Sequence, residues 1–325
     1  MQPLTLEPDK TFVLSHTYSY DSIYTVTVTV ADGQGGSGND TVSVTVNNIE
    51  PTVNAGPNAT VDEGSAFTRS GSFTDPGADT WTATVDYRDG SGVLPLTLNP
   101  DKSFTLSHIY SDNGTYSVTV NITDDDGGTG SDTATVNVNN MAPIVDAGVD
   151  VTINFGDSVT IEASFTDAGT QDAHTATIDW DDGTPPELGV VTENDGSGSV
   201  TSAHTYLWPG TYTVAITVTD NDNDANSDSL LVIVTAAPEL LINIIIDDVM
   251  SLDIPEGTKN SLISKLEVAM KRLEDSNTQN DVAAINALEA FVNSVEAQRG
   301  KKILSEDADA LITKAQEIIA SLNGG

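Results

Sequence analysis

Two groups of aspartates are the residues of this sequence best suited to chemistry. The first contains Asp75, Asp79, Asp124 and Asp126, and the second contains Asp167, Asp172, Asp220, Asp222 and Asp224. Carboxylates in this number suit Ca²⁺, a hard cation that takes about six to eight oxygen ligands and accepts Asn and backbone carbonyls among them. We therefore predict Ca²⁺ sites at these residues. The alternative is that they are solvated acidic loops that only confer solubility.

The composition excludes several classes of function. The 325 residues include 49 acidic, 12 basic and four His side chains and no Cys, for a net charge of −37. Nucleic acids and anionic membrane surfaces need clustered Lys and Arg, so we expect neither as a partner. The lack of Cys rules out disulfides, thiol catalysis and cysteine metal sites.

Residues 1–7 have neither the basic start nor the apolar run of a signal peptide, and no apolar stretch is long enough to span a bilayer. We therefore expect a secreted or cell-surface protein with no membrane insertion, whose export signal lies outside this sequence.

Catalysis is the weaker interpretation of the polar residues. Asp86 with Asp89, or Asp179 with Asp182, could act as a general acid and base, but a tight turn after a strand explains each pair more simply. Three histidines each precede a Tyr by two residues, namely His16, His108 and His204. Because this position recurs along the chain, we predict a structural hydrogen bond there rather than catalysis. No Gly-x-Ser-x-Gly motif is present. We predict that the protein is not an enzyme.

An internal repeat organises the first 236 residues. Residues 94–143 match residues 2–51 at a constant offset of 92, and the same offset relates residues 51–64 to 143–156. The chain therefore contains a half module (1–50), a middle module (51–142) and a last module (143–236). Apolar and polar residues alternate within each module, and turn residues fall every eight to twelve positions, which is typical of a β-sandwich.

Composition and periodicity change near Pro238. Residues 1–239 contain 35 acidic and four basic side chains, whereas residues 240–325 contain 14 and eight. Apolar residues then recur at helical spacing, with Leu262, Leu266 and Leu273 on one face. Residues 240–325 therefore form a small α-helical bundle. Its leading segment, Leu240–Leu252, is expected as a helix, although Ile244–Ile246 could also be a strand.

Several motifs resemble those of PKD repeats, which are immunoglobulin-like sandwiches. In the last module these are Asp179-Trp-Asp-Asp-Gly183, His204-Thr-Tyr206 and Pro209-Gly-Thr-Tyr; in the middle module they are Asp86-Tyr-Arg-Asp-Gly90, His108-Ile-Tyr110 and Gly114-Thr-Tyr116. The half module keeps only His16-Thr-Tyr18 and Tyr24. The resemblance implies a mainly β fold of tandem sandwiches that serve as spacers, adhesion modules or accessory domains of extracellular proteins. The C-terminal helices resemble the FIMAH type of domain.

In such a sandwich, the loops after the second and sixth strands lie at one pole, beside the linker from the preceding module. These loops carry the two aspartate groups, and the linkers carry Asn47-Asn48 and Asn139-Asn140. Each pole would therefore gather at least five carboxylates, which repel one another unless a cation neutralises them.

Glycans and polysaccharides are further possible partners. Sequons for N-glycosylation occur at Asn39, Asn58, Asn113 and Asn121, although some arise by chance in a chain rich in Asn, Thr and Ser. Trp81 and Trp208 could stack on a sugar ring, with packing inside the protein as the alternative. Trp180 is expected in a core.

The half module decides between functional interpretations. We expect two or three strands among Phe12–Tyr18, Ile23–Val30 and Thr41–Val46, with an apolar face that nothing in residues 1–50 covers. Three explanations are open: upstream modules in a longer protein, disorder, or cover by a neighbouring chain. The third predicts a homopolymeric filament in which copies associate head-to-tail, the donor being the helical domain or an added strand such as Leu240–Ile246. The alternative function is the accessory substrate-binding region of a secreted hydrolase.

Overall fold

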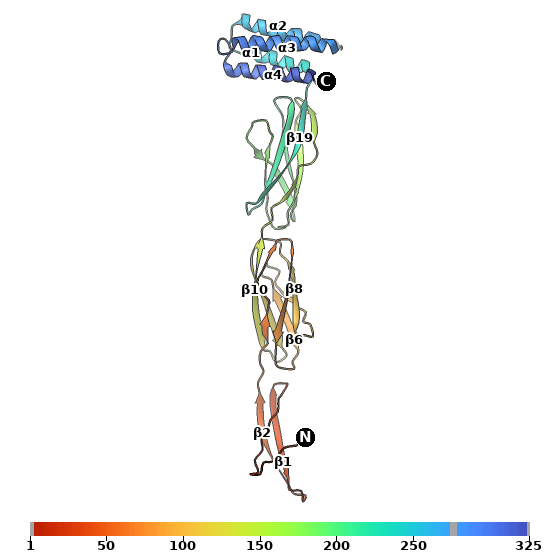
Figure 1. The fold of residues 1–325 in the computed structure, drawn as a ribbon, viewed down its shortest axis with the longest axis vertical. Coiled ribbons are helices and arrows are strands. Elements are labelled where there is room, and N and C mark those ends of the chain that lie inside the picture. The colour runs from red at the N-terminus through yellow and green to blue at the C-terminus, as the bar shows by residue number, and fades with distance from the viewer. Residues whose placement is uncertain (1–2, 274–277, 324–325) are drawn as a thin grey trace.

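The computed structural model describes residues 3–273 and 278–323, and the side chains of these residues except those of 278–280. The chain forms an elongated rod in which the half module, the middle module, the last module and a helical bundle follow one another along the long axis (Figure 1). The half module lies at one end and the bundle at the other. No helix in the described ranges is long and apolar enough to cross a membrane.

The half module is a two-stranded antiparallel sheet. Its strands are β1 (Ser22–Ala31) and β2 (Ser37–Val46), with Tyr24 opposite Val44. The prediction of a strand at Phe12–Tyr18 is wrong, since this segment joins no sheet. Its counterpart in the middle module, β8 (Ser103–Ile109), is held by pairing with β5 (Ala66–Thr74), and residues 1–50 contain no equivalent of β5.

The middle module is a sandwich of two sheets. One sheet has the order β4-β10-β9-β6-β7, and the other has β3-β5-β8. The remaining strands are β3 (Thr52–Asn54), β4 (Ala59–Asp62), β6 (Trp81–Asp86), β7 (Val93–Pro95), β9 (Gly114–Asp124) and β10 (Thr129–Asn139). Alternate residues of the central strands, such as Val118, Val120 and Ile122, are fully buried between the sheets.

The last module repeats this arrangement. Its sheets have the orders β12-β19-β18-β14-β15 and β11-β13-β17-β16. The strands are β11 (Ile144–Asp146), β12 (Val151–Asn154), β13 (Val159–Thr166), β14 (Thr175–Asp179), β15 (Glu187–Leu188), β16 (Val190–Asn194), β17 (Ser197–His204), β18 (Gly210–Thr219) and β19 (Ala225–Thr235). Trp180 lies in its core, as predicted, with 1% of its surface exposed.

The C-terminal region is a bundle of α1 (Pro238–Ser251), α2 (Glu256–Leu273), α3 (Thr278–Gln298) and α4 (Ser305–Asn323). One apolar face of each helix meets the others in a shared core that includes Ile242, Ile245 and Leu266. The expected leading helix is confirmed, and the alternative strand at Ile244–Ile246 is wrong. Residues 240–246 are therefore committed to this core and cannot serve as a donated strand.

Two of the three repeated histidines form the predicted structural hydrogen bond, and for His16 this stays a prediction. His108 Nε2 lies 2.6 Å from Asp89 Oδ2, and His204 Nε2 lies 2.9 Å from Asp182 Oδ2. Each aspartate sits in a tight turn that follows a strand and also accepts hydrogen bonds within that turn. These contacts connect the turn to the strand that carries the histidine. Asp89 and Asp182 therefore help to hold the two sheets of each sandwich together.

A tryptophan joins the last module to the bundle. Trp208 Nε1 donates a hydrogen bond to Glu317 Oε2, and Lys314 Nζ lies 4.8 Å from the centroid of the Trp208 ring. The ring also packs against the apolar core of the bundle. Trp208 is thus a contact between domains, and its indole is not free to stack on a sugar.

Replacing Trp208 by Ala should loosen the bundle from the last module. The variant loses a cation–π contact and a hydrogen bond to a carboxylate, together worth about 1–3 kcal/mol of docking free energy. Limited proteolysis should then cut the connection at residues 235–238 faster than in the wild type. Leu207→Ala is the matched control, because Leu207 is 86% exposed; equal cleavage rates in all three proteins would contradict the assignment.

Candidate metal sites at the module junctions

Carboxylates from two modules meet at the second junction, between the middle and last modules. Carboxylate oxygens of Asp167, Asp172 and Asp220 all lie within 4.8 Å of one another. The same holds for Glu63, Asp112 and Asp172, of which the first two belong to the middle module. Asp172 is common to both groups, so its carboxylate connects the two modules.

Local turns present these side chains. Asp167 directly follows β13, and its Oδ1 accepts a hydrogen bond from the backbone N–H of Gly169. Asp220 opens the turn between β18 and β19, where its Oδ1 accepts from the backbone N–H groups of Asp222 and Asp224. A Cβ at Gly169 would clash with Asp172 Oδ2 and Glu63 Cδ, so a larger residue there would displace these carboxylates.

The linker takes part in the same arrangement. Asn140 Nδ2 donates to Asp220 Oδ2 at 2.9 Å and to Asp224 Oδ2 at 3.0 Å. Glu63 Oε1 accepts from the backbone N–H of Met141 at 2.7 Å. Linker residues thus donate hydrogen bonds to carboxylates of both modules. These bonds fix the carboxylate oxygens of the junction relative to one another.

Four buried oxygens at this junction have no hydrogen-bond partner. They are Glu63 Oε2, Asn140 Oδ1, Asp172 Oδ1 and Asp172 Oδ2. Glu63 is only 1% exposed and Asp172 only 8% exposed. An unpaired buried carboxylate carries a large desolvation cost, so each of these oxygens calls for a positively charged partner.

The pKa values reflect this electrostatic cost. Burial raises the pKa of Glu63 to about 7, and repulsion from Asp172 and Asp167 adds to the effect. Burial also raises the pKa of Asp172 to about 6, with Asp167 as the next cause. Both groups are therefore harder to ionise than free carboxyl groups, and a bound cation would favour their ionised forms.

One histidine orients the site. His174 Nε2 lies 3.0 Å from Asp167 Oδ2, and His174 Nδ1 lies 2.7 Å from Glu193 Oε2. Burial lowers the pKa of His174, but its hydrogen bonds to the two carboxylates outweigh burial and raise the pKa above its usual range. Residues 103–258 contain no Lys or Arg. The basic side chains of the last module are therefore His174 and His204, and His174 is the one that contacts Asp167 of the site.

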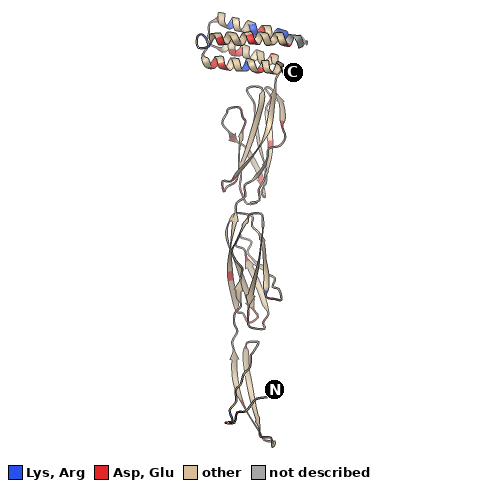
Figure 2. Ribbon diagram, viewed as in Figure 1, with Lys and Arg blue, Asp and Glu red and all other residues tan. Residues whose placement is uncertain are grey.

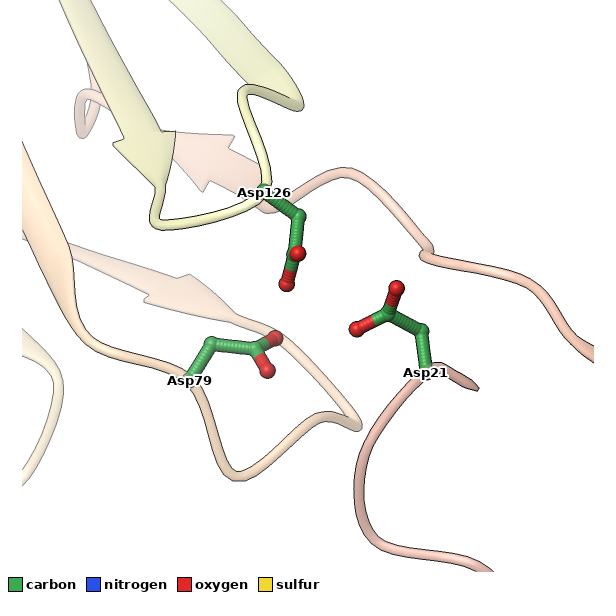
Figure 3. A group of neighbouring side chains, drawn as sticks. All are labelled: Asp21, Asp79 and Asp126. Atoms are coloured by element: carbon green, nitrogen blue, oxygen red, sulfur yellow. The ribbon is translucent and has the colours of Figure 1, made fainter. Parts of the chain in front are cut away.

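The first junction, between the half and middle modules, repeats the plan. Asp75, Asp79 and Asp124 form one group, and Asp21, Asp79 and Asp126 form another. Figure 3 shows the carboxylates of Asp21, Asp79 and Asp126 pointing toward one another from three separate segments. Asp21 precedes β1 and so comes from the half module. Burial, followed by repulsion from Asp75, raises the pKa of Asp79.

Bonds around the first junction match those of the second. Asn48 Nδ2 donates to Asp124 Oδ2 at 2.8 Å, as Asn140 does to Asp220. Trp81 Nε1 donates to Asp75 Oδ2 at 2.9 Å, which is the role of His174 toward Asp167. Lys102 Nζ lies 4.2 Å from the Trp81 ring centroid. Trp81 is therefore engaged inside the module, as the alternative to sugar stacking predicted.

The structure brings together most of the aspartates predicted from the sequence. Asp75, Asp79, Asp124 and Asp126 gather at the first junction, and Asp167, Asp172 and Asp220 gather at the second. Asp222 and Asp224 lie outside these groups; Asp224 bonds to Asn140, and Asp222 is exposed.

Sequence reasoning missed three carboxylates from the preceding module, namely Asp21, Glu63 and Asp112. The prediction considered the pole of one module at a time. One signal was available in the sequence. Asp21 and Asp112 occupy neighbouring positions of the repeat, in the segments that lead to Tyr24 and Tyr116.

The oxygen spacing fits a shared cation. Two oxygens bound to one Ca²⁺ at about 2.4 Å each lie at most about 4.8 Å apart, the spacing that these groups satisfy. The donors are carboxylate and amide oxygens, without the thiols or neutral imidazoles that favour zinc or copper. The residues present therefore suit a hard divalent cation.

The predicted glycosylation sites lie on the β-modules. Asn39 is exposed in β2, and Asn58 is exposed just before β4. Asn113 lies in the turn before β9, and Asn121 is a half-buried residue of β9 that pairs with β6 and β10. Their modification stays a prediction.

Comparison with known families identifies the modules. The PKD domain family matches residues 48–139 and 140–234, more than half of the chain. A search among curated proteins gives no match. The resemblance of the helical bundle to the FIMAH type stays a prediction, because the matched residues end before α1.

Solved structures give only distant similarities. An E-to-A mutated variant of titin Ig domains I67–I69 is 13% identical, with 72% of this chain and 82% of that chain covered and a TM-score of 0.38. Cadherin domains 1–5 of protocadherin gamma B2 are 13% identical, covering 73% and 51%, with a TM-score of 0.26. The Bacteroides ovatus glucan-locus protein SGBP-B, in complex with a heptasaccharide, is 17% identical, covering 59% and 49%, with a TM-score of 0.23. Scores this low carry no conclusion about function.

The buried carboxylates predict an unusual pH dependence for the metal-free protein. The pKa of Glu63 is higher in the folded than in the unfolded state, so the folded state binds more protons between about pH 4 and about pH 7. The free energy of unfolding should therefore fall as pH rises through this window. Relative to Glu63→Gln, the wild type should lose stability between about pH 4 and about pH 7 in urea unfolding with excess chelator.

Glu162→Gln is the matched control, because Glu162 is exposed on β13. Its pH profile should parallel that of the wild type. If the Glu63→Gln profile is also parallel, Glu63 is not destabilised by its surroundings.

Proposed function

We propose, for a chain that belongs to the PKD-domain family, that it is a non-catalytic extracellular protein whose modules form a stiff spacer held in line by Ca²⁺. Tandem PKD domains are typical of extracellular adhesive or structural proteins, and the described chain forms a rod (Figure 1). In the carboxylate pairs Asp86/Asp89 and Asp179/Asp182, the second aspartate contacts a histidine and the first accepts a backbone hydrogen bond within its turn. A structural role therefore accounts for these carboxylates and for His108 and His204.

The unpaired buried oxygens at the second junction carry this proposal. Glu63 and Asp172 come from different modules, yet each places an oxygen without a partner in the same buried region. Without a cation, their mutual repulsion favours separation of the modules. A Ca²⁺ ion bound by both would reverse the sign of this interaction and attach one module to the next.

Charge along the rod fits this role. Lys and Arg side chains lie mainly on the helical bundle, whereas the β-modules are dominated by acidic residues (Figure 2). The modules therefore depend on ions from the medium for neutralisation. Divalent cations are abundant outside cells at the concentrations that extracellular Ca²⁺ modules require, with Kd of about 10⁻⁴–10⁻³ M.

Residues 1–50 are the proposed assembly surface. The two-stranded sheet leaves hydrophobic side chains such as Val30 and Val42 nearly half exposed. Contact between this surface and a neighbouring copy would be head-to-tail and would propagate into a filament unless its rotation closed a ring. We propose that the protein is a subunit of such a homopolymeric filament or stalk.

The alternative of a polysaccharide-binding region of a hydrolase has lost its main support. Trp81 bonds to Asp75, and Trp208 bonds to the helical bundle. The two rings proposed for sugar stacking therefore have partners within the chain.

Removing Ca²⁺ should lower the melting temperature of the modules. At free Ca²⁺ of 100 times Kd, one site stabilises the folded state by about 2.7 kcal/mol, or roughly 10 °C for a domain of this size. Differential scanning calorimetry with Ca²⁺ and with excess chelator measures the shift. Asp172→Asn should abolish most of the shift in the last module, whereas the exposed control Glu162→Gln should keep it. A melting curve that does not respond to chelator would refute the Ca²⁺ proposal.

Deleting residues 1–46 should leave folded monomers that no longer assemble. The middle and last modules and the bundle keep their own cores, so their melting should change little. Sedimentation and negative-stain imaging compare the deletion with the full chain in Ca²⁺. Filaments formed by the truncated protein would contradict the assembly role of residues 1–50.

A further inference from the structure

The carboxylates of the second junction fall into two groups that share one residue. The inner group is Asp167, Asp172 and Asp220, and the joint group is Glu63, Asp112 and Asp172. In each group the three ligand oxygens lie within 4.8 Å of one another, but the five residues together do not form one such group. A single ion at about 2.4 Å from each ligand therefore cannot take an oxygen from all five residues.

The two groups differ in the modules that supply them. All three residues of the inner group lie in loops of the last module, two between β13 and β14 and one directly after β18. The joint group takes Glu63 and Asp112 from the middle module and only Asp172 from the last. The inner group is thus complete within one module, whereas the joint group exists only while the two modules are in contact.

Buried oxygens without a hydrogen-bond partner occur at both groups. Asp172 is 8% exposed and leaves both of its oxygens unpaired, so it can offer one oxygen to each group. In the joint group, Glu63 is 1% exposed and leaves Oε2 unpaired. Beside the inner group, Asn140 leaves Oδ1 unpaired while its Nδ2 donates to Asp220. Each group therefore presents buried oxygens that a cation would satisfy.

The number of charges also favours two divalent cations. When ionised, the five carboxylates of the two groups carry five negative charges. One divalent cation would leave three of these charges without compensation, whereas two would leave one. Residues 103–258 contain no Lys or Arg that could neutralise the remainder. A second cation therefore removes most of the repulsion that a first one leaves.

We propose that the second junction binds a pair of divalent cations bridged by Asp172, one in the inner group and one in the joint group. The inner ion binds first and positions the Asp172 carboxylate. The joint ion binds second and fixes the middle module to the last. This inference rests on the proposed Ca²⁺ role, and it adds the number of ions, their ligands and the order in which they bind.

The inner ion binds more tightly because its ligands are already ordered. Asp167 accepts a backbone hydrogen bond in its turn, Asp220 accepts two, and the linker residue Asn140 donates to Asp220 as well. The joint ion must instead order two modules relative to each other, and it lies beside an ion of the same charge. Both costs weaken its binding. Fixing of the modules therefore requires a higher Ca²⁺ concentration than filling of the inner group.

The loop that carries Asp172 is also the loop that contacts the middle module. The backbone N–H of Gln171 donates to the carbonyl of Ser111 at 3.3 Å. A Cβ at Gly64 would lie 3.0 Å from the Cβ of Ala168, so the two modules approach closely there. An ion that orders this loop therefore prepares the surface on which the middle module docks.

The first junction shows the same overlap of two groups. Its shared residue is Asp79, which belongs to one group within the middle module and to a second group that includes Asp21 of the half module. The backbone N–H of Ala78 donates to the carbonyl of Ser19 at 2.9 Å, as Gln171 does to Ser111. A carboxylate shared between an inner and a joint group is therefore a repeated feature of the rod.

Counting the bound ions in matched variants tests the pair. Equilibrium dialysis of the full chain against radioactive Ca²⁺, at the lowest free concentration that saturates the wild type, gives the number of ions per chain. Glu63→Gln should lose one ion, because Glu63 belongs only to the joint group, whereas Asp172→Asn should lose two. Asp112→Asn repeats the loss of one ion from the other joint residue. Glu162→Gln, at an exposed residue of β13, should lose none.

Other counts contradict the inference in distinguishable ways. A loss of one ion in both Glu63→Gln and Asp172→Asn would indicate a single shared ion, which overturns the pair and keeps the proposed Ca²⁺ role. A loss of two ions in Glu63→Gln would overturn the order of binding. A loss in Asp172→Asn alone would leave only the inner ion, so the modules would not be attached through Ca²⁺. A wild type that binds no Ca²⁺, or no loss in any variant, would refute both proposals at this junction.

The division of roles between the two ions has a structural readout. Since the chain contains no Cys, spin labels on Thr68→Cys and Thr160→Cys, at exposed residues of β5 and β13, report the distance between the two modules. At saturating Ca²⁺ the distance distribution of the otherwise wild-type chain should be narrow, whereas Glu63→Gln should stay broad although its inner ion is bound. A narrow distribution in Glu63→Gln would overturn the role of the joint ion.

The same labels test the order of binding. The difference in bound Ca²⁺ between Glu63→Gln and Asp172→Asn gives the concentration range in which the inner ion binds. The labelled chain with Glu63 intact should narrow its distance distribution only above this range. Narrowing within or below the range would overturn the order, while the ion counts would still decide whether the pair exists.

Discussion

The balance of negative charge at the module junctions is the constraint on which the rest of the rod depends. Glu63 and Asp172 lie in different modules, are almost fully buried and leave oxygens without partners in the same region. Such a contact is unfavourable between ionised carboxylates and favourable around a divalent cation. With the proposed Ca²⁺ bound, the packing of one module on the next would depend on the ions of the surrounding medium.

Comparison of the middle and last modules shows which contacts are kept and which side chains differ. Trp81 in the middle module and His174 in the last module both donate an N–H to the first aspartate of the same loop. Tyr87 and Trp180 both stack on the repeated histidine. In each case the contact is kept although a different side chain makes it. The sandwich therefore requires the position of the aspartate and of the histidine.

The two ends of the rod differ in how complete they are. At one end, Trp208 ties the last module to a helical bundle with its own apolar core. At the other, β1 and β2 retain an open edge and an exposed apolar face. Between the two ends, the charged side chains of the β-modules are mostly acidic (Figure 2).

The sequence by itself determined the fold class, the repeat of 92 residues and the helical C-terminal region, because alternation, helical spacing and self-similarity are properties of the chain alone. It also placed Asp75, Asp124, Asp167 and Asp220 at shared poles, since loops of a sandwich emerge at fixed ends. Only the tertiary structure decided that Asp21, Glu63 and Asp112 reach across from the preceding module, because local patterns do not reveal how two modules pack. It also decided that Phe12–Tyr18 is no strand, since a β-strand needs a partner and periodicity cannot supply one.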